Sequence, residues 1–278
     1  MEGFGLVFYN FPDYTLEQFA QYAGAAGFSY AEIMIQHLWN ERDPADYAEA
    51  RASEVGALLR RHGLQPSAVA AGNDFLALGD GSEALTRQVE RLKRVCRLAR
   101  LAGTDLIRID GGWQKDGVPD DRDYWFARIV AGLRGIQPFI EREAYTLALD
   151  NHGLVTNDAD FQVRIFEAVG SPRIGANVDT MNYRWAGHDL ATVGRYYHTI
   201  APYARHVHVK DGTGSRGTYR GTALGDGEID LELAVRELRG AGYAGPWCVE
   251  FEGDRAQAEE GYRRGLSWLR THVSASGA

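Results

Sequence analysis

The chain has 278 residues, of which 45% are hydrophobic and 24% are charged, as in an ordinary globular protein with a sizeable core. It carries 30 Lys and Arg against 38 Asp and Glu, and the formal net charge of −8 argues against a surface for nucleic acid, which needs clustered cations. The two cysteines are too few for a disulfide framework. We see no signal peptide and no apolar run of the ~20 residues that span a bilayer, so we expect a cytoplasmic protein with no membrane partner.

Short apolar runs alternate with amphipathic segments along the whole chain. The predicted strands are 6–8, 30–35, 66–71, 106–109, 147–149, 174–178, 206–209 and 247–251. The predicted helices are 15–26, 45–62, 82–102, 123–143, 158–168, 189–199, 230–239 and 256–273. Polar residues such as Thr15, Asp158 and Asp230 mark helix starts, and glycines such as Gly27 and Gly170 mark helix ends.

This alternation predicts a single (β/α)8 barrel domain over residues 1–278, because eight strand–helix units fit the size of about 250 residues typical of that fold. The alternative is an open, doubly wound sheet. Such a sheet carries phosphate-binding glycines after its first strand, and the turn at 10–13 has none.

The carboxyl ends of the predicted strands are unusually polar. Period-two alternation directs Val207 and Val209 toward the helices, and therefore His206, His208 and Lys210 into the lumen. The same reasoning places Arg108, Asp110, Glu250 and Glu252 in the lumen. Because an unpaired buried charge costs several kcal/mol, so many charges call for a cation or for tight pairing.

Four of these polar side chains end adjacent strands on one side of the barrel mouth. They are Asp150, Asp179, His208 and Glu250. Three carboxylates and one imidazole form a mixed oxygen and nitrogen set that suits one divalent ion, Mn²⁺ first and otherwise Mg²⁺, Co²⁺ or Zn²⁺. The alternative interpretation is a set of separate structural ion pairs with nearby cations.

Six short stretches resemble the xylose isomerase-like barrels, and within them the sugar phosphate isomerase/epimerase group with its tagatose-type 3-epimerases. The stretches are AGNDF (71–75), LALDNHG (147–153), NVD (177–179), HVHVKD (206–211), LGDGE (224–228) and CVEFE (248–252). The resemblance implies a (β/α)8 barrel and a divalent ion held by the same four residues. It differs at one position, since the epimerases carry a glutamate where this chain has Asp150.

The chemistry expected of such a site is enolisation of a keto-sugar. A divalent ion stabilises the negative charge that develops on the carbonyl oxygen, and a carboxylate or imidazole removes the α proton. We expect Glu250 to be the base and Asp150 or His152 to be the second acid/base.

Further residues are candidates for contacts with a sugar. They are His37, Asn73, Arg108, Asn182, Lys210 and Arg216. Each has a structural alternative: Arg108, for example, is expected to pair with Glu32 or Asp110 if it does not contact substrate. GTGSRG at 212–217 fits G-x-G-x-x-G, but no helix opens at its third glycine, so it predicts a lid loop carrying Arg216 rather than a dinucleotide site.

The leading hypothesis is therefore a metal-dependent isomerase or epimerase of a monosaccharide or cyclitol. A lyase that dehydrates a keto-inositol or cleaves a C-glycoside could use the same site. The related AP-endonuclease fold is disfavoured because Asn73, Asp110 and Asn182 stand where it needs histidine ligands. A catalytically silent binding subunit is the remaining alternative. The resemblance implies a homo-oligomer, and a required second subunit stays open.

Overall fold

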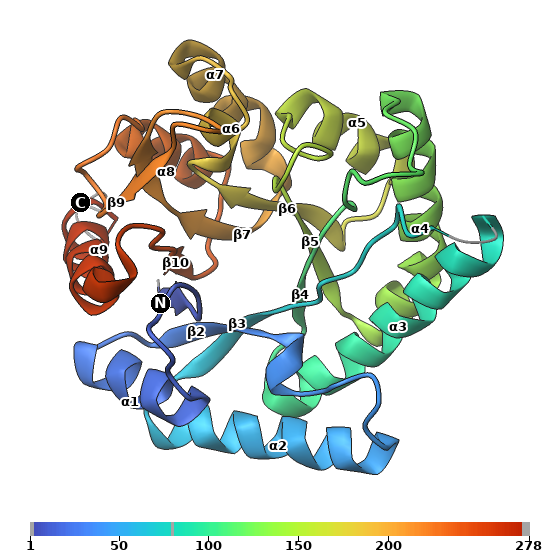
Figure 1. The fold of residues 1–278 in the computed structure, drawn as a ribbon, viewed down its shortest axis with the longest axis horizontal. Coiled ribbons are helices and arrows are strands. Elements are labelled where there is room, and N and C mark those ends of the chain that lie inside the picture. The colour runs from blue at the N-terminus through green and yellow to red at the C-terminus, as the bar shows by residue number, and fades with distance from the viewer. Residues whose placement is uncertain (1–2, 79–80, 274–278) are drawn as a thin grey trace.

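The computed structural model describes residues 3–78 and 81–273, and in it eight parallel strands close into a barrel (Figure 1). The strands follow the order β1-β10-β7-β6-β5-β4-β3-β2 around the barrel. Their bounds are β1 Phe4–Val7, β2 Tyr30–Met34, β3 Gln65–Ala70, β4 Leu106–Ile109, β5 Thr146–Asp150, β6 Ile174–Asp179, β7 Ala204–Val209 and β10 Trp247–Val249. The predicted fold is confirmed, and all eight predicted strands lie within about three residues of the observed ones.

Helices surround the barrel on the outside (Figure 1). They are α1 Leu16–Ala26, α2 Ala45–Arg61, α3 Gly81–Ala102, α4 Arg122–Glu143, α5 Ala159–Val169, α7 Leu190–Ile200, α8 Leu231–Gly240 and α9 Ala258–His272, with a short α6 at Asn182–Trp185 and 3₁₀ turns η1 Ile35–His37, η2 Ala201–Tyr203 and η3 Arg255–Gln257. Thr15, Asp158 and Asp230 cap their helices as predicted. In the described part of the chain, no helix is long and apolar enough to cross a bilayer.

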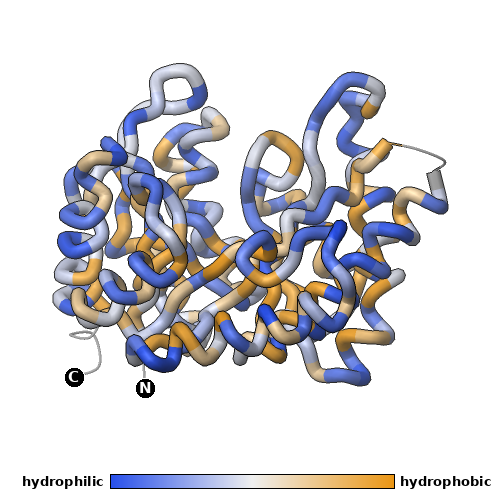
Figure 2. The backbone as a smooth tube through the Cα atoms, turned by 60° about the horizontal axis from the view of Figure 1, so that its bottom comes forward, coloured by the Kyte–Doolittle hydropathy of each residue, from blue (hydrophilic) through white to orange (hydrophobic). Residues whose placement is uncertain are grey.

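Two kinds of side chain alternate along the strands. One set points outward and packs beneath the helices, fully or almost fully buried: Leu6, Ile33, Val69, Ile107, Leu149, Val178, Val207 and Val249. Figure 2 shows hydrophobic segments running through the centre of the molecule, with loops of mixed hydropathy rising at the top. The other set faces the lumen. Where barrel interiors are usually filled by branched apolar residues, this one is charged.

A small antiparallel hairpin, β8 (Asp211–Thr213) and β9 (Arg220–Thr222), is inserted after β7. The sequence predicted a loop here, because the strands are short and contain glycine. Asp211 anchors the segment that follows: its carboxylate accepts hydrogen bonds from the backbone amides of Gly212, Gly225, Gly227 and Ile229 at 2.8–3.3 Å. The LGDGE stretch therefore wraps around this carboxylate, and a Cβ at Gly227 would lie only 2.0 Å from its Oδ1.

Candidate active site

A pocket of about 100 Å³ lies at the carboxyl ends of the strands, where the lumen opens. It is lined by Val7, Tyr9, Met34, Arg108, Asp150, His152, Asn182, Lys210, Glu250 and Glu252. Six of the residues predicted from sequence thus face one cavity, which we call the inner pocket. Asp179 and His208 lie beside it, fully or almost fully buried.

Asp179, His208 and Glu250 converge on one point: each offers a ligand atom, and these atoms lie within 4.8 Å of one another. Asp179 Oδ1 accepts hydrogen bonds from the amides of Met181 and Asn182, both at 2.9 Å, which turns Oδ2 toward the cluster. Asp179 Oδ2 and His208 Nδ1 are buried, and each lies in an ion pair: Nζ of Lys210 is 3.0 Å from Asp179 Oδ2, and Oε2 of Glu250 is 2.7 Å from His208 Nδ1. Two carboxylates and one imidazole that converge in this way are a donor set that suits a divalent ion.

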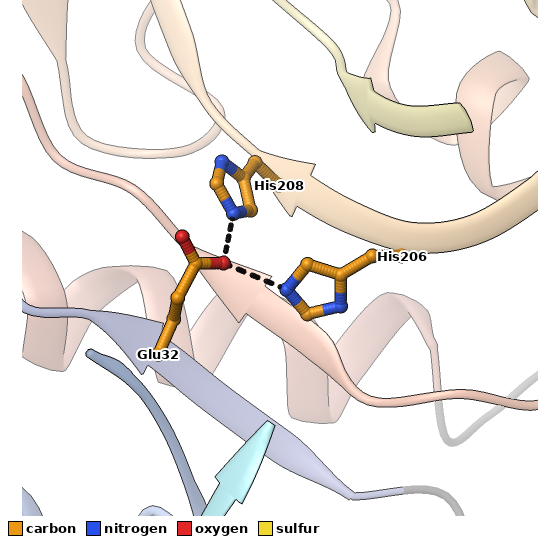
Figure 3. Close-up of side chains that lie close together, drawn as sticks. All are labelled: Glu32, His206 and His208. Carbon is orange, nitrogen blue, oxygen red and sulfur yellow. Dashed lines mark hydrogen bonds and ion pairs between the residues drawn. The ribbon is translucent and has the colours of Figure 1, made fainter. Parts of the chain in front are cut away.

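Glu32 on β2 fixes the orientation of His208 from across the lumen (Figure 3). Its Oε2 lies 2.6 Å from Nε2 of His208 and 2.9 Å from Nε2 of His206, and its Oε1 accepts from Nε of Arg108 at 2.7 Å. With Nε2 of His208 donating to Glu32, Nδ1 is the nitrogen left to face Glu250 at 2.7 Å. A carboxylate behind an imidazole is a common way of orienting a metal-binding histidine.

The pKa values of this buried network follow from its charges. Burial opposes ionisation of Glu32, but the charges of His208 and Arg108 outweigh it and hold the pKa of Glu32 well below its usual value. Burial lowers the pKa of His206 and keeps that ring neutral. For His208, burial acts in the same direction, but Glu32 and Glu250 outweigh it and raise the pKa to about 10.

Two other clusters of three residues could also supply metal ligands, although several of their donor atoms are already in hydrogen bonds. In the cluster of Glu32, His206 and His208, the Nε2 atoms of both histidines contact Oε2 of Glu32, and Arg108 donates to its Oε1. In the cluster of Asp110, Asp150 and His152, Asp150 receives Nη1 of Arg108 at 2.6 Å and Nδ2 of Asn177 at 2.8 Å, one on each oxygen. In the cluster of Asp179, His208 and Glu250, a bound ion would displace Lys210 from Asp179 Oδ2 and the proton that His208 Nδ1 shares with Glu250.

Lys210 is buried among carboxylates next to this cluster. Its Nζ lies 3.0 Å from Asp179 Oδ2, 3.3 Å from Glu252 Oε2 and 3.5 Å from Glu250 Oε1. Burial lowers the pKa of Lys210, but these three carboxylates outweigh it and raise the pKa well above its usual value. Burial raises the pKa of Asp179 to about 6, although Lys210 acts against it.

The lumen carries more negative than positive charge. Its six carboxylates, on Glu32, Asp110, Asp150, Asp179, Glu250 and Glu252, face only three cations, on Arg108, Lys210 and protonated His208. A dication bound here would replace one proton of His208 and still reduce the imbalance by one charge.

Three predicted substrate contacts lie elsewhere. His37 stacks on Phe8 with ring centroids 4.9 Å apart, and its Nδ1 accepts from the amide of Met34 at 3.1 Å; burial lowers its pKa to about 4. Asn73 is buried and uses both polar atoms on the backbone of Asp110, at 2.6 and 2.9 Å. Arg216 lines a second cavity at the mouth. The structural alternative for Arg108 holds, since it pairs with both Glu32 and Asp110, at 2.7 and 3.8 Å.

Sequence reasoning missed the central position of Glu32 and the part played by Asn177, which positions Asp150. The feature that could have indicated a central role for Glu32 is its charge, since the rest of its predicted strand is largely apolar. Asn177 faces the lumen two residues before Asp179, and pairs in register with Asp150 on the neighbouring strand. That pairing is visible only once the strand register is known.

Comparison with known proteins extends these observations to a family. The family model described as xylose isomerase-like TIM barrel matches residues 20–272. The chain belongs to this family. The resemblance read from the six short stretches is thereby confirmed.

Relatives in the family include sugar epimerases. The L-ribulose-5-phosphate 3-epimerase UlaE of Escherichia coli O1:K1 is 23% identical over 275 residues, covering 92% of this chain and 89% of the relative. A D-psicose 3-epimerase solved in the presence of D-fructose superposes with a TM-score of 0.77 at 16% identity, covering 98% of this chain and 99% of its own. The IOLI protein, solved with a zinc atom, gives a TM-score of 0.78 at 15% identity and covers 98% of both chains. At these identities the solved structures show the shared fold.

Proposed function

We propose that this protein is a divalent-metal-dependent isomerase or epimerase of a monosaccharide or cyclitol. The observation that carries the proposal is the convergence of Asp179, His208 and Glu250, with ligand atoms within 4.8 Å of one another, beside a pocket at the barrel mouth. The epimerase relatives support the reaction class. Zinc in a structural neighbour supports metal dependence.

Asp179, His208 and Glu250 are the proposed metal ligands, with Mn²⁺ as the first candidate and Mg²⁺, Co²⁺ and Zn²⁺ as the others. Asp150, the fourth ligand expected from sequence, joins them only if it releases Arg108, to which it is 2.6 Å away. Once bound, the ion supplies Lewis-acid stabilisation of the negative charge on the substrate carbonyl oxygen.

Glu250 is the proposed base. Its pKa is lowered despite burial, because Lys210 and His208 outweigh the desolvation, so it is ionised and able to take a proton from the carbon next to the carbonyl. The C–H electron pair then forms the carbon–carbon double bond of an enediolate, and the carbonyl oxygen takes the charge. Lys210, buried beside Glu250, adds a positive charge near that oxygen.

His152 is the proposed acid that returns the proton. Burial lowers the pKa of His152, but the carboxylates of Asp110, 3.9 Å from Nδ1, and of Asp150 outweigh this and raise it, which favours the protonated form. Its side chain is 47% exposed at the pocket wall, whereas both oxygens of Asp150 are occupied by Arg108 and Asn177. Protonation from the opposite face inverts the carbon, and protonation of the neighbouring carbon isomerises the sugar.

The occupied state of Asp150 also favours a second candidate. Elimination needs only one base, so a lyase acting on a keto-inositol or a C-glycoside could operate with Glu250 alone. Product mass separates the two: elimination releases water or an aglycone, whereas isomerisation conserves mass.

The test measures metal content and proton exchange together. Elemental mass spectrometry should find about one divalent ion per chain in the wild type and none in His208→Ala. His198→Ala is the matched control, because that imidazole is 80% exposed on α7 and pairs with Glu237, away from the proposed ligands. NMR of ketoses incubated in D₂O should then show deuterium entering next to the carbonyl. Equal metal content in the wild type and His208→Ala would refute the proposed ligand set.

A further inference from the structure

A second, larger cavity adjoins the inner pocket, and apart from His152 its residues have no part in the chemistry proposed so far. We call it the outer pocket; its volume is about 690 Å³. It is lined by Trp113, Gln114, Lys115, Asp116, Gly117, Val118, His152, Gly153, Leu154, Trp185 and Arg216. These residues come from the loops after β4 and β5, from α6 and from the turn between β8 and β9. His152 lines both pockets, so the two meet at its ring.

The inner pocket is small for a complete ligand. Its volume of about 100 Å³ lies below the roughly 300–1,000 Å³ of ordinary small-molecule sites, a range that the outer pocket meets. A substrate whose reacting carbons reach Glu250 therefore extends past His152 and into the outer pocket.

The walls of the outer pocket expose apolar side chains. Trp113 is 40% exposed and Leu154 is 38% exposed. The indole of Trp113 meets His152 edge to face, with ring centroids 5.1 Å apart, so the indole stands at the junction of the two pockets. Large apolar side chains gathered in one cavity mark a binding surface more often than a solvated one, and an indole ring offers a flat apolar face to another ring.

One cation in the outer pocket is uncommitted. The amide of Arg216 bonds to the carbonyl of Trp185 at 2.7 Å, which ties the β8–β9 turn to α6. Within residues 3–78 and 81–273, no ion pair or hydrogen bond of the Arg216 guanidinium is found, whereas Lys115 pairs with Asp74. Arg216 is thus able to donate to oxygen atoms of a ligand lying on the tryptophan.

We propose that the outer pocket is a subsite for a second ring of the substrate. The substrate class is then a keto-sugar with a glycosidically linked sugar ring at the end remote from its carbonyl, and this inference rests on the proposed function. The reacting unit enters the inner pocket with its carbonyl carbons foremost. The second ring lies on Trp113, and its hydroxyl oxygens accept hydrogen bonds from Arg216.

Calorimetric titration of the Mn²⁺-loaded protein tests this with three probes. D-Fructose offers one unit, isomaltulose adds a glucose ring at its sixth oxygen, and D-fructose 6-phosphate places an anion there instead. We expect isomaltulose to bind about tenfold more tightly than D-fructose, as expected for a stacking contact together with its buried area. Trp113→Ala should reduce this ratio to near one.

Matched variants separate a local effect from a general one. Leu101→Ala removes an apolar side chain of the same exposure, 41%, at the end of α3 near the opposite face of the barrel, and should keep the tenfold ratio. Leu154→Ala should reduce the ratio partially, which keeps the test valid if Trp113→Ala fails to fold.

Equal affinity of the wild type for isomaltulose and D-fructose would overturn the second-ring subsite alone. Preference for D-fructose 6-phosphate, lost in Arg216→Gln, would overturn it in favour of a phosphate subsite. Failure of all three sugars to bind would refute the proposed sugar function, and the subsite with it.

Discussion

Replacing Glu32 with glutamine preserves the shape of the side chain and removes its charge. Glu32 is fully buried and accepts from Arg108, His206 and His208 at 2.7, 2.9 and 2.6 Å. Glutamine has one acceptor oxygen in place of two, and its NH₂ group would face N–H donors that the second carboxylate oxygen of Glu32 accepts from. Breaking a buried charged network by removing one partner costs about 3–5 kcal/mol. At about 2–4 °C per kcal/mol for a chain of this size, Tm should fall by about 10 °C.

The assay is thermal and urea unfolding of the wild type, Glu32→Gln and Glu83→Gln. Glu83 is the matched control, because its side chain is 72% exposed and faces Arg87 at 3.7 Å, so its loss should change stability by less than about 0.5 kcal/mol. Glu32→Gln should also weaken metal binding about 10–100-fold, since Glu32 orients His208. A stability loss below about 1 kcal/mol would refute the claim that Glu32 holds the lumen together.

Three further predictions concern single residues. In the folded protein the pKa of His37 is about 4, below its usual value of 6.5, so the folded state binds fewer protons than the unfolded one and stability falls as pH drops from about 6.5 toward 4. Denaturant unfolding at pH 7 and pH 5 should therefore show a loss of stability in the wild type that exceeds the loss in His37→Asn by up to about 1 kcal/mol, after allowance for partial exposure. Asp211→Asn, which turns an amide toward the backbone N–H groups that the carboxylate accepts from, should lower the free energy of unfolding by about 2–4 kcal/mol. Its control, Asp226→Asn, changes an exposed carboxylate in the same segment and should leave unfolding within about 0.5 kcal/mol. Lys210→Met removes a cation 3.0 Å from a proposed ligand oxygen and should tighten Mn²⁺ binding about tenfold in a competition titration, while Lys93→Gln on the surface of α3 should not; weaker binding in Lys210→Met would contradict the proposed repulsion.

The barrel was predictable because each strand–helix unit carries its own local signals. Thr15 and Asp158 cap their helices, and Gly27 and Gly170 end them with φ of 91° and 69°. These features act within a few residues, so a single sequence contains them. The β8–β9 hairpin escaped prediction because three-residue strands such as Arg220–Thr222 are too short for a period-two pattern.

The candidate site was predictable in content but not in pairing. Alternation correctly directed His208 and Lys210 into the lumen, because facing depends only on the parity of the position. It could not show that Arg108 and Asn177 occupy both oxygens of Asp150, since those contacts depend on register and side-chain reach across three strands. The role of Asn73 was not predictable for a similar reason. The sequence does not distinguish an amide that hydrogen-bonds to the backbone after the neighbouring strand from one that would contact a sugar.

The span of the Glu32 network bears on how the chain folds. Glu32 is separated by 174 and 176 positions from the two histidines that it contacts. During synthesis, β2 is made early, and its carboxylate meets those imidazoles only after β7 has been added. In a fragment ending before β7, Arg108 would be the one partner of the three still present for this carboxylate. Long-range closure of this kind is slow. We therefore expect the favourable burial of Glu32 to require closure of the ring.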